Sequence, residues 1–165
     1  MQRVLVAYLS QTGNTEKVAK AIYDVLPCEK EIKEISDKVD LIGYGLIFCG
    51  FPVHAHSVPV KARPFLKKLA NNQKVAFFTT HGSLTGGTFA KQALEDALGM
   101  TTHTKVIGTF ACRGRVKPEI IEALSKKLEH EAWISEAGSA DEHPTAADLS
   151  DAEDFALKMC QKAQI

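Results

Sequence analysis

The sequence has no surplus of charge of either sign. Its 165 residues include 20 Lys and Arg and 20 Asp and Glu, so the formal net charge is zero. Proteins that bind nucleic acids usually carry a marked basic excess, and carriers that dock by long-range attraction carry a marked acidic one. We therefore predict no nucleic-acid partner and no docking that depends mainly on bulk charge.

Long apolar runs and clustered cysteines are also missing. No stretch reaches the roughly 20 apolar residues of a membrane-spanning helix, and the run Val4–Leu9 is too short for a signal peptide. We expect a cytoplasmic protein with no membrane partner. The four cysteines form no CxxC pair, and Cys49 and Cys112 lie in apolar runs, so we predict that both are buried free thiols.

The chain alternates short apolar runs with amphipathic stretches. Such runs are typical of strands that are covered on both faces. We predict strands at Val4–Leu9, Glu29–Ile35 (at an edge of the sheet), Leu46–Cys49, Val75–Thr79 and Val106–Cys112. We predict helices from Thr15 to Leu26, Pro59 to Leu69, Thr88 to Leu98 (with Gly99 as its C-cap), Pro118 to about Trp133, and Ala146 to Ala163. This order predicts an α/β domain over residues 1–165 with a parallel sheet, helices on both faces, and one extra helix before the C-terminal one.

The loop after the first strand, Ser10–Thr15, carries the clearest functional signal. It reads Ser-Gln-Thr-Gly-Asn-Thr and contains no Lys or Arg. Gly13 lets the backbone approach a ligand closely, and the amides that open the following helix favour an anion. Because neither GK[ST] nor GxGxxG is present, the loop predicts neither a Walker A site nor a dinucleotide site. We expect a monophosphate held by neutral donors, although the same residues could form a simple capped turn.

The segment from Val6 to Ile22 resembles the FMN-phosphate signature of the flavodoxin family. It keeps an aromatic at Tyr8, hydroxyls at three loop positions, and the small Gly13, whereas Ala7 departs from the usual larger apolar residue. The resemblance implies a flavodoxin-like three-layer sandwich with a five-stranded sheet in the order 2-1-3-4-5. It also implies that the phosphate of FMN is bound by Ser10, Gln11, Thr12, Gly13, Asn14 and Thr15.

In flavodoxins, the loops after the third and fourth strands hold the flavin ring. The resemblance therefore implies ring contacts from Phe51, Pro52, Val53 and His54 in the first loop, and from Thr80, His81, Gly82, Gly86 and Gly87 in the second. Both loops lack the usual stacking Trp or Tyr, and neither carries an acidic residue. Since negative surroundings disfavour an anionic reduced ring, we predict a less negative low-potential couple than that of a classical flavodoxin.

The histidines, arginines and tryptophan leave several alternatives open. His54 and His56 form an HxH pair, which supplies too few ligands for a zinc site, so we predict no metal. His81 could donate to a reduced flavin or could simply pack in its loop. His103, His130 and His143 belong to no constellation, so exposure is expected. Arg113 and Arg115 could meet an anionic substrate or an acidic partner, or could be solvated, and Trp133 is expected to pack its helix rather than to contact a cofactor.

Three classes of function can be compared. The preferred one is an FMN-binding electron-transfer flavoprotein that serves redox partner proteins. The alternative is an oxidoreductase, either an FMN-dependent reductase of NAD(P)H or a small-molecule substrate or the flavoprotein partner of a larger reductase. A receiver-type signalling module needs an Asp at the end of the third strand, where Phe48-Cys49-Gly50 stands, and the GxSxG sequence of a hydrolase is missing.

Overall fold

A five-stranded parallel sheet forms the centre of the protein. The structure, a computed structural model, describes residues 2–82, 87–127 and 131–165. The strands are β1 (Arg3–Tyr8), β2 (Lys30–Glu34), β3 (Tyr44–Pro52), β4 (Lys74–His81) and β5 (Lys105–Arg113). They pair in the order β2-β1-β3-β4-β5, so the predicted topology is confirmed, with β2 at one edge.

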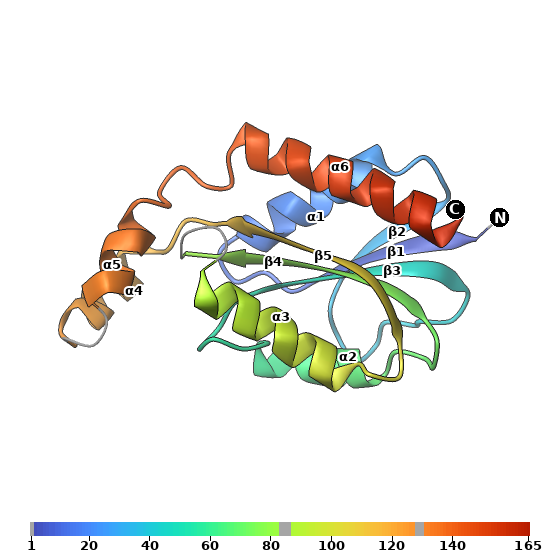
Figure 1. Cartoon of the computed structure of the whole chain (residues 1–165), viewed down its shortest axis with the longest axis horizontal. Coiled ribbons are helices and arrows are strands. Elements are labelled where there is room, and N and C mark those ends of the chain that lie inside the picture. The colour runs from blue at the N-terminus through green and yellow to red at the C-terminus, as the bar shows by residue number, and fades with distance from the viewer. Residues whose placement is uncertain (1, 83–86, 128–130) are drawn as a thin grey trace.

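Helices cover both faces of this sheet. Helices α1 (Asn14–Val25) and α6 (Ala146–Ala163) lie side by side on one face. Helix α2 (Arg63–Lys67), which follows a 3-10 turn at Val60–Ala62, and helix α3 (Thr88–Met100) cover the other face (Figure 1). The chain therefore has the flavodoxin-like three-layer arrangement, and it begins helix α6 at the residue that the sequence indicated.

Two further helices lie beyond the carboxyl ends of the strands. They are α4 (Pro118–Ser125) and α5 (Glu131–Gly138), which pack against each other at the far left of Figure 1. The single helix predicted from Pro118 to about Trp133 is therefore wrong, because α4 ends at Ser125. The predicted C-cap of α3 is also wrong, since that helix continues through Gly99 to Met100.

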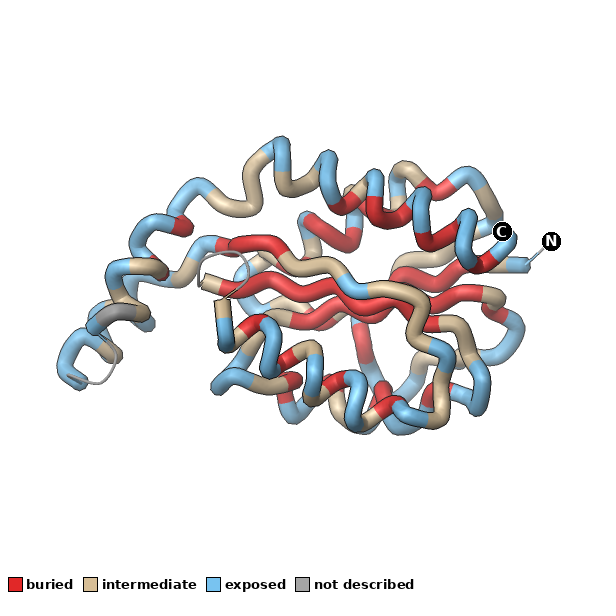
Figure 2. The backbone as a smooth tube through the Cα atoms, in the orientation of Figure 1, coloured by how far each residue is buried: buried red, intermediate tan, exposed pale blue. Residues whose placement is uncertain are grey.

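The sheet separates two hydrophobic cores, which Figure 2 shows as the buried stretches of its strands. The side chains of Val6, Phe48 and Phe78 pack beneath α1 and α6, and those of Ile47 and Phe77 pack beneath α2 and α3. Because successive side chains of a strand point to opposite faces, each central strand contributes to both cores. This explains why these strands are almost continuously apolar.

The buried cysteines agree with the sequence analysis. Cys49 and Cys112 are buried free thiols, as predicted. Burial raises the pKa of both thiols, that of Cys112 to about 12, so both remain protonated at neutral pH. Within the described ranges, no helix is both long enough and apolar enough to cross a membrane.

Candidate functional site

The turn between β1 and α1 forms an open cradle of neutral donors. Gly13 is the N-cap residue of α1 and has a φ of 90°, a conformation that glycine adopts without strain. Its amide donates to Ser10 Oγ over 3.1 Å. A Cβ atom at Gly13 would meet no heavy atom within 4 Å, and among the described residues no side chain caps the helix. The first-turn amides therefore have no capping side chain within the described residues, and an anion can accept from them.

Two of the predicted phosphate residues, Thr15 and Asn14, bond to distant parts of the chain. Thr15 is 1% exposed, and its hydroxyl lies 2.9 Å from that of Thr80 on β4. The Thr15 side chain therefore ties α1 to the sheet. Asn14 Nδ2 donates to the carbonyl oxygen of Arg115 over 2.8 Å and to Thr12 Oγ1 over 3.2 Å, so it joins the cradle to the segment after β5.

A glycine after β5 makes room for that link. A Cβ atom at Gly114 would lie 2.6 Å from Asn14 Nδ2, closer than real contacts allow. The sequence analysis did not identify Gly114 as part of the site. A signal was available, because Gly114 directly follows a strand whose carboxyl end lies at this edge of the sheet.

The cradle opens into a cavity of about 660 Å³. Four parts of the chain line it, namely the cradle itself, the segment after β3, the end of β4, and the segment from β5 to α5. Its lining residues are Gln11, Thr12, Asn14, Pro52, Val53, His54, Ala55, His56, Thr80, His81, Gly82, Phe89, Gly114, Arg115, Val116, Lys117, Ile120, Leu124 and Trp133. Among these described residues none is acidic, and Arg115 and Lys117 are cationic.

The structure brings most of the predicted ring contacts to this cavity. Pro52, Val53 and His54 line it from one side, and Thr80, His81 and Gly82 from another. Gly87 is the N-cap residue of α3, and Gly86 lies outside the described residues.

The prediction for Phe51 is wrong. Its side chain is fully buried in the core beneath α2 and α3 and meets the Phe77 ring edge-on, with the centroids 6.3 Å apart. Phe51 lies within β3 rather than in a loop, because the strand continues to Pro52. Its side chain therefore cannot flank a ring in the cavity.

The segment after β3 is held in a tight turn. His54 and Ser57 exchange backbone hydrogen bonds of 3.1 and 3.0 Å, and Ala55 and His56 between them have positive φ angles. The His56 ring stacks on Phe89 of α3, with the centroids 3.7 Å apart. The Ser57 hydroxyl donates to Asp96 of α3, which anchors the turn to the helix layer.

Three residues of the α4–α5 pair were missed as cavity residues. Ile120 and Leu124 of α4 and Trp133 of α5 line the cavity. Trp133 was expected to pack its helix rather than to contact a cofactor, and the structure adds that it lines the cavity. The available signal was the extra helical sequence after β5, which topology places at the carboxyl edge of the sheet.

Arg113 fixes α5 to the end of the sheet. It is 8% exposed, and its Nη2 atom donates to the Glu136 carbonyl oxygen and to Ser139 Oγ, each over 2.7 Å. Of the three alternatives considered for Arg113, an anionic substrate, an acidic partner and a solvated loop, its burial contradicts the solvated loop, and its bonds to α5 give it a structural role. Arg115 is exposed, and its Nε atom pairs with Asp141 over 2.9 Å.

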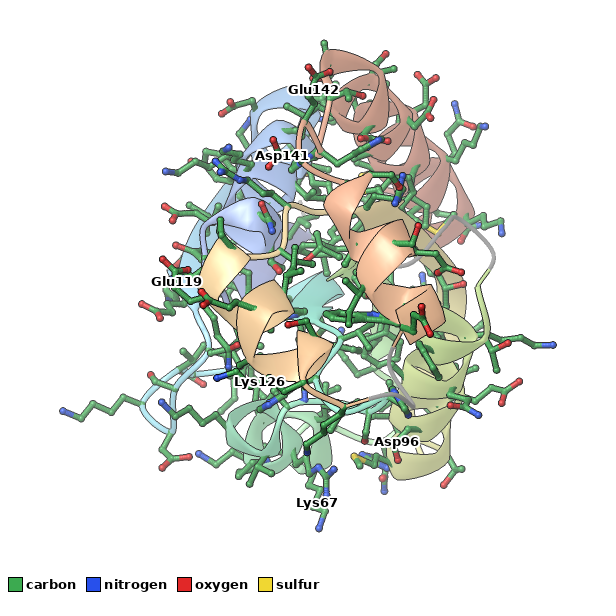
Figure 3. All side chains as sticks on the ribbon, turned by 90° about the vertical axis from the view of Figure 1, so that its left-hand side faces the viewer. Lys67, Asp96, Glu119, Lys126, Asp141 and Glu142 are labelled. Atoms are coloured by element: carbon green, nitrogen blue, oxygen red, sulfur yellow. The ribbon has the colours of Figure 1, made fainter. Side chains whose placement is uncertain are left out.

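A second cavity of about 670 Å³ adjoins the first at Thr12, Asn14, Arg115 and Lys117. Its other lining residues are Lys17, Pro118, Glu119, Asp141, Glu142 and His143, which include charges of both signs. Figure 3 looks onto this end of the molecule, with Asp141 and Glu142 toward α1 and α6, and with Lys67 and Asp96 near α2 and α3.

Two histidines expected to be exposed are half-buried and bonded. His143 Nδ1 lies 2.6 Å from Asp148 Oδ2, and His103 Nε2 lies 2.8 Å from the Leu69 carbonyl oxygen. Burial opposes ionisation of Asp148, but hydrogen bonds from Thr145 and His143 outweigh it and hold the pKa of this carboxyl below its usual value. His130 lies outside the described residues.

Comparisons with known proteins agree with this architecture. A family model described as "Flavodoxin domain" matches residues 5–157. A flavodoxin-like domain-containing protein, BilS of Clostridioides difficile, is 29% identical over an alignment of 173 positions that covers 98% of each chain.

Solved structures share the fold at lower identity. Oxidised Flavodoxin 2 from Bacillus cereus superposes with a TM-score of 0.66 at 18% identity, covering 97% of this chain and 99% of that one. A flavoprotein from Lactobacillus acidophilus, solved in complex with FMN, gives a TM-score of 0.56 at 20% identity, covering 67% of this chain and 93% of that one.

Proposed function

The chain belongs to the flavodoxin domain family, and from this premise we propose that it binds one FMN and passes electrons through it. One observation carries the proposal: the uncapped N-terminus of α1 opens, through a neutral cradle, into a cavity at the carboxyl edge of a parallel sheet. Open α/β sheets bind their ligands at this position. The L. acidophilus relative of the same fold, which was solved with FMN, adds support.

The chemistry of the donors fits a phosphate monoester. The first-turn amides of α1, together with Ser10 and Thr12, offer neutral hydrogen-bond donors to an anion, and the helix dipole adds to their attraction. Pro52, Val53 and His54 would flank the ring on one side, and Thr80, His81 and Gly82 would lie along another. When bound, FMN supplies one- and two-electron transfer, whereas the protein positions it and tunes its charge.

The residues of the cavity favour negative charge on a bound ring. Lys117 and Arg115 line the cavity, and none of its described lining residues is acidic, although Arg115 is paired with Asp141, which lies outside this lining. Cations stabilise an anion across a site that is partly shielded from water. We therefore propose an electron carrier of the cytoplasm whose low-potential couple is less negative than that of a classical flavodoxin. Its partners would be redox proteins.

Titration of the apoprotein with FMN tests the proposal. We expect tight 1:1 binding of FMN and weaker binding of riboflavin, which lacks the phosphate. The variants Ser10→Ala and Thr12→Val should each weaken FMN binding roughly ten- to hundredfold, because a hydrogen bond to a charged group contributes about 1.5–3 kcal/mol. Their effect on riboflavin should be small.

A matched control keeps that experiment specific. Thr102 is an exposed threonine after α3, outside both cavities, so Thr102→Val should leave FMN affinity unchanged. A protein that binds no FMN, or that binds FMN and riboflavin equally, would contradict the phosphate assignment.

A second candidate function is a reductase of NAD(P)H or a small molecule, or the flavoprotein subunit of a larger reductase. The second cavity favours it, because Lys17 and Lys117 offer cations to an anionic co-substrate beside the cradle, whereas Arg115 is paired with Asp141 and Glu119 and Glu142 add negative charge. Rapid oxidation of NADH or NADPH by the FMN-loaded protein alone would favour this enzyme. Reduction only in the presence of a partner protein would favour the carrier.

A further inference from the structure

An aromatic wall is expected beside a flavin ring, and the loops here do not supply it in the usual way. Phe51 points into the core, and one face of the Phe89 ring is covered by the stacked ring of His56. Of the described residues that line the cavity, Trp133 is therefore the aromatic side chain whose ring is not taken up by another ring contact. It is also the single tryptophan of the chain.

Trp133 reaches the end of β4 from a distant part of the sequence. A Cβ atom at Gly82 would lie 3.8 Å from Trp133 Cζ2, so the indole lies against the first residue after β4. Ile120 and Leu124 of α4 line the same cavity, and Ile120 is 43% exposed. Apolar groups that face a cavity in this way gain when a ligand covers them.

The position of this wall is set by a buried cation. Arg113, at the end of β5, donates to the Glu136 carbonyl oxygen and to Ser139 Oγ, both at the carboxyl end of α5. These bonds join α5 to the sheet rather than leaving it tethered only by its ends. A fixed indole loses little conformational freedom when a ligand stacks on it.

We propose that Trp133, carried by the α4–α5 insertion, is the aromatic wall of the flavin-ring site and replaces the aromatic that is missing from the two ring loops. Arg113 acts as a positioning residue for this wall. The inference rests on the proposed binding of FMN and adds to it a contact from outside the two loops. Aromatic pairs prefer stacked or edge-on contacts and gain beyond the area that they bury.

Variants of Trp133 in the full-length protein test the inference. We expect Trp133→Ala to weaken FMN binding roughly tenfold, and Trp133→Phe to keep affinity within about threefold of the wild type. The visible absorption bands of bound FMN should shift in Trp133→Phe. The control Ile134→Ala changes the neighbouring residue of α5, which is not among the described lining residues, and should alter neither affinity nor spectrum.

The outcomes separate the two proposals. If the wild type binds no FMN, both the proposed function and this inference fail. If the wild type binds FMN, and Trp133→Ala and Trp133→Phe match it in affinity and in spectrum, the inference alone is overturned. If Trp133→Ala does not fold, Trp133→Phe still decides, because an unshifted spectrum refutes the contact and a shifted one, with Ile134→Ala unshifted, supports it.

Discussion

The hydroxyl pair of Thr15 and Thr80 provides a test of whether Thr15 is a ligand or a structural residue. The two oxygen atoms lie 2.9 Å apart, and the residues are 1% and 3% exposed. Replacing either threonine by valine leaves the other hydroxyl buried without its partner, which costs about 1–3 kcal/mol. For a chain of this size, that loss lowers the midpoint of thermal unfolding by roughly 2–12 °C. Replacing both together removes the orphaned group, so the double variant should be more stable than the sum of the single losses predicts.

The assay is a double-mutant cycle on the apoprotein, read by urea unfolding. We expect a coupling free energy of about 1–2 kcal/mol between the two positions. FMN affinity of Thr15→Val should change less than threefold, because its hydroxyl is engaged with Thr80, whereas Thr12→Val should weaken binding strongly. Additive losses in stability would refute the hydrogen bond. A stable Thr15→Val protein with greatly weakened FMN binding would return Thr15 to the role of a phosphate ligand.

Three further perturbations probe the surroundings of the site. Gly114→Ala should lower the free energy of unfolding by about 1–3 kcal/mol and weaken FMN binding, because its Cβ would displace Asn14; unchanged urea midpoints would contradict this. Asp148→Asn should cost about 1 kcal/mol at pH 7 by weakening the cap at Thr145. The folded-state pKa of Asp148 lies below its unfolded value, so the wild type should lose its extra stability over Asp148→Asn as the pH falls from about 4 through the folded-state pKa. Equal urea midpoints of the two proteins at pH 7 would refute the role of the cap. Lys117→Glu should make the low-potential couple of bound FMN more negative by roughly 20–40 mV in a redox titration. An unchanged potential would show that the charge of Lys117 does not act on the ring.

The fold could be predicted largely because its signals are local. Buried parallel strands require nearly continuous apolar runs, which the sequence displays in the expected alternation with helices. The C-terminal helix has a capping box in which Thr145 and Asp148 satisfy each other's backbone amides. Such a start is readable from sequence, and the predicted range Ala146–Ala163 is confirmed.

The α4–α5 insertion could not be predicted in the same way. The sequence between Ser125 and Glu131 contains neither glycine nor proline, so nothing in it marks the end of α4. The hydrogen bond from Arg113 that fixes α5 could not be predicted either, because an arginine that donates to a backbone carbonyl leaves no pattern in the sequence near its acceptor. Arg113 and Glu136 are 23 residues apart, and only the folded chain brings them together.

Strand parity explains which of the predicted ring residues can face a ligand. The sequence located the two ring loops, but β3 and β4 extend further than the apolar runs, and each added residue must point to one face or the other. Phe51 shares its face with Ile47, which directs it beneath α2 and α3, and Thr80 shares its face with Phe78, which directs it toward Thr15. Because Phe51 and Thr80 point into the layers on either side of the sheet, an aromatic wall for the cavity has to come from outside the two loops. The insertion after β5 begins at the same edge of the sheet, and for this reason it is the part of the chain best placed to supply one.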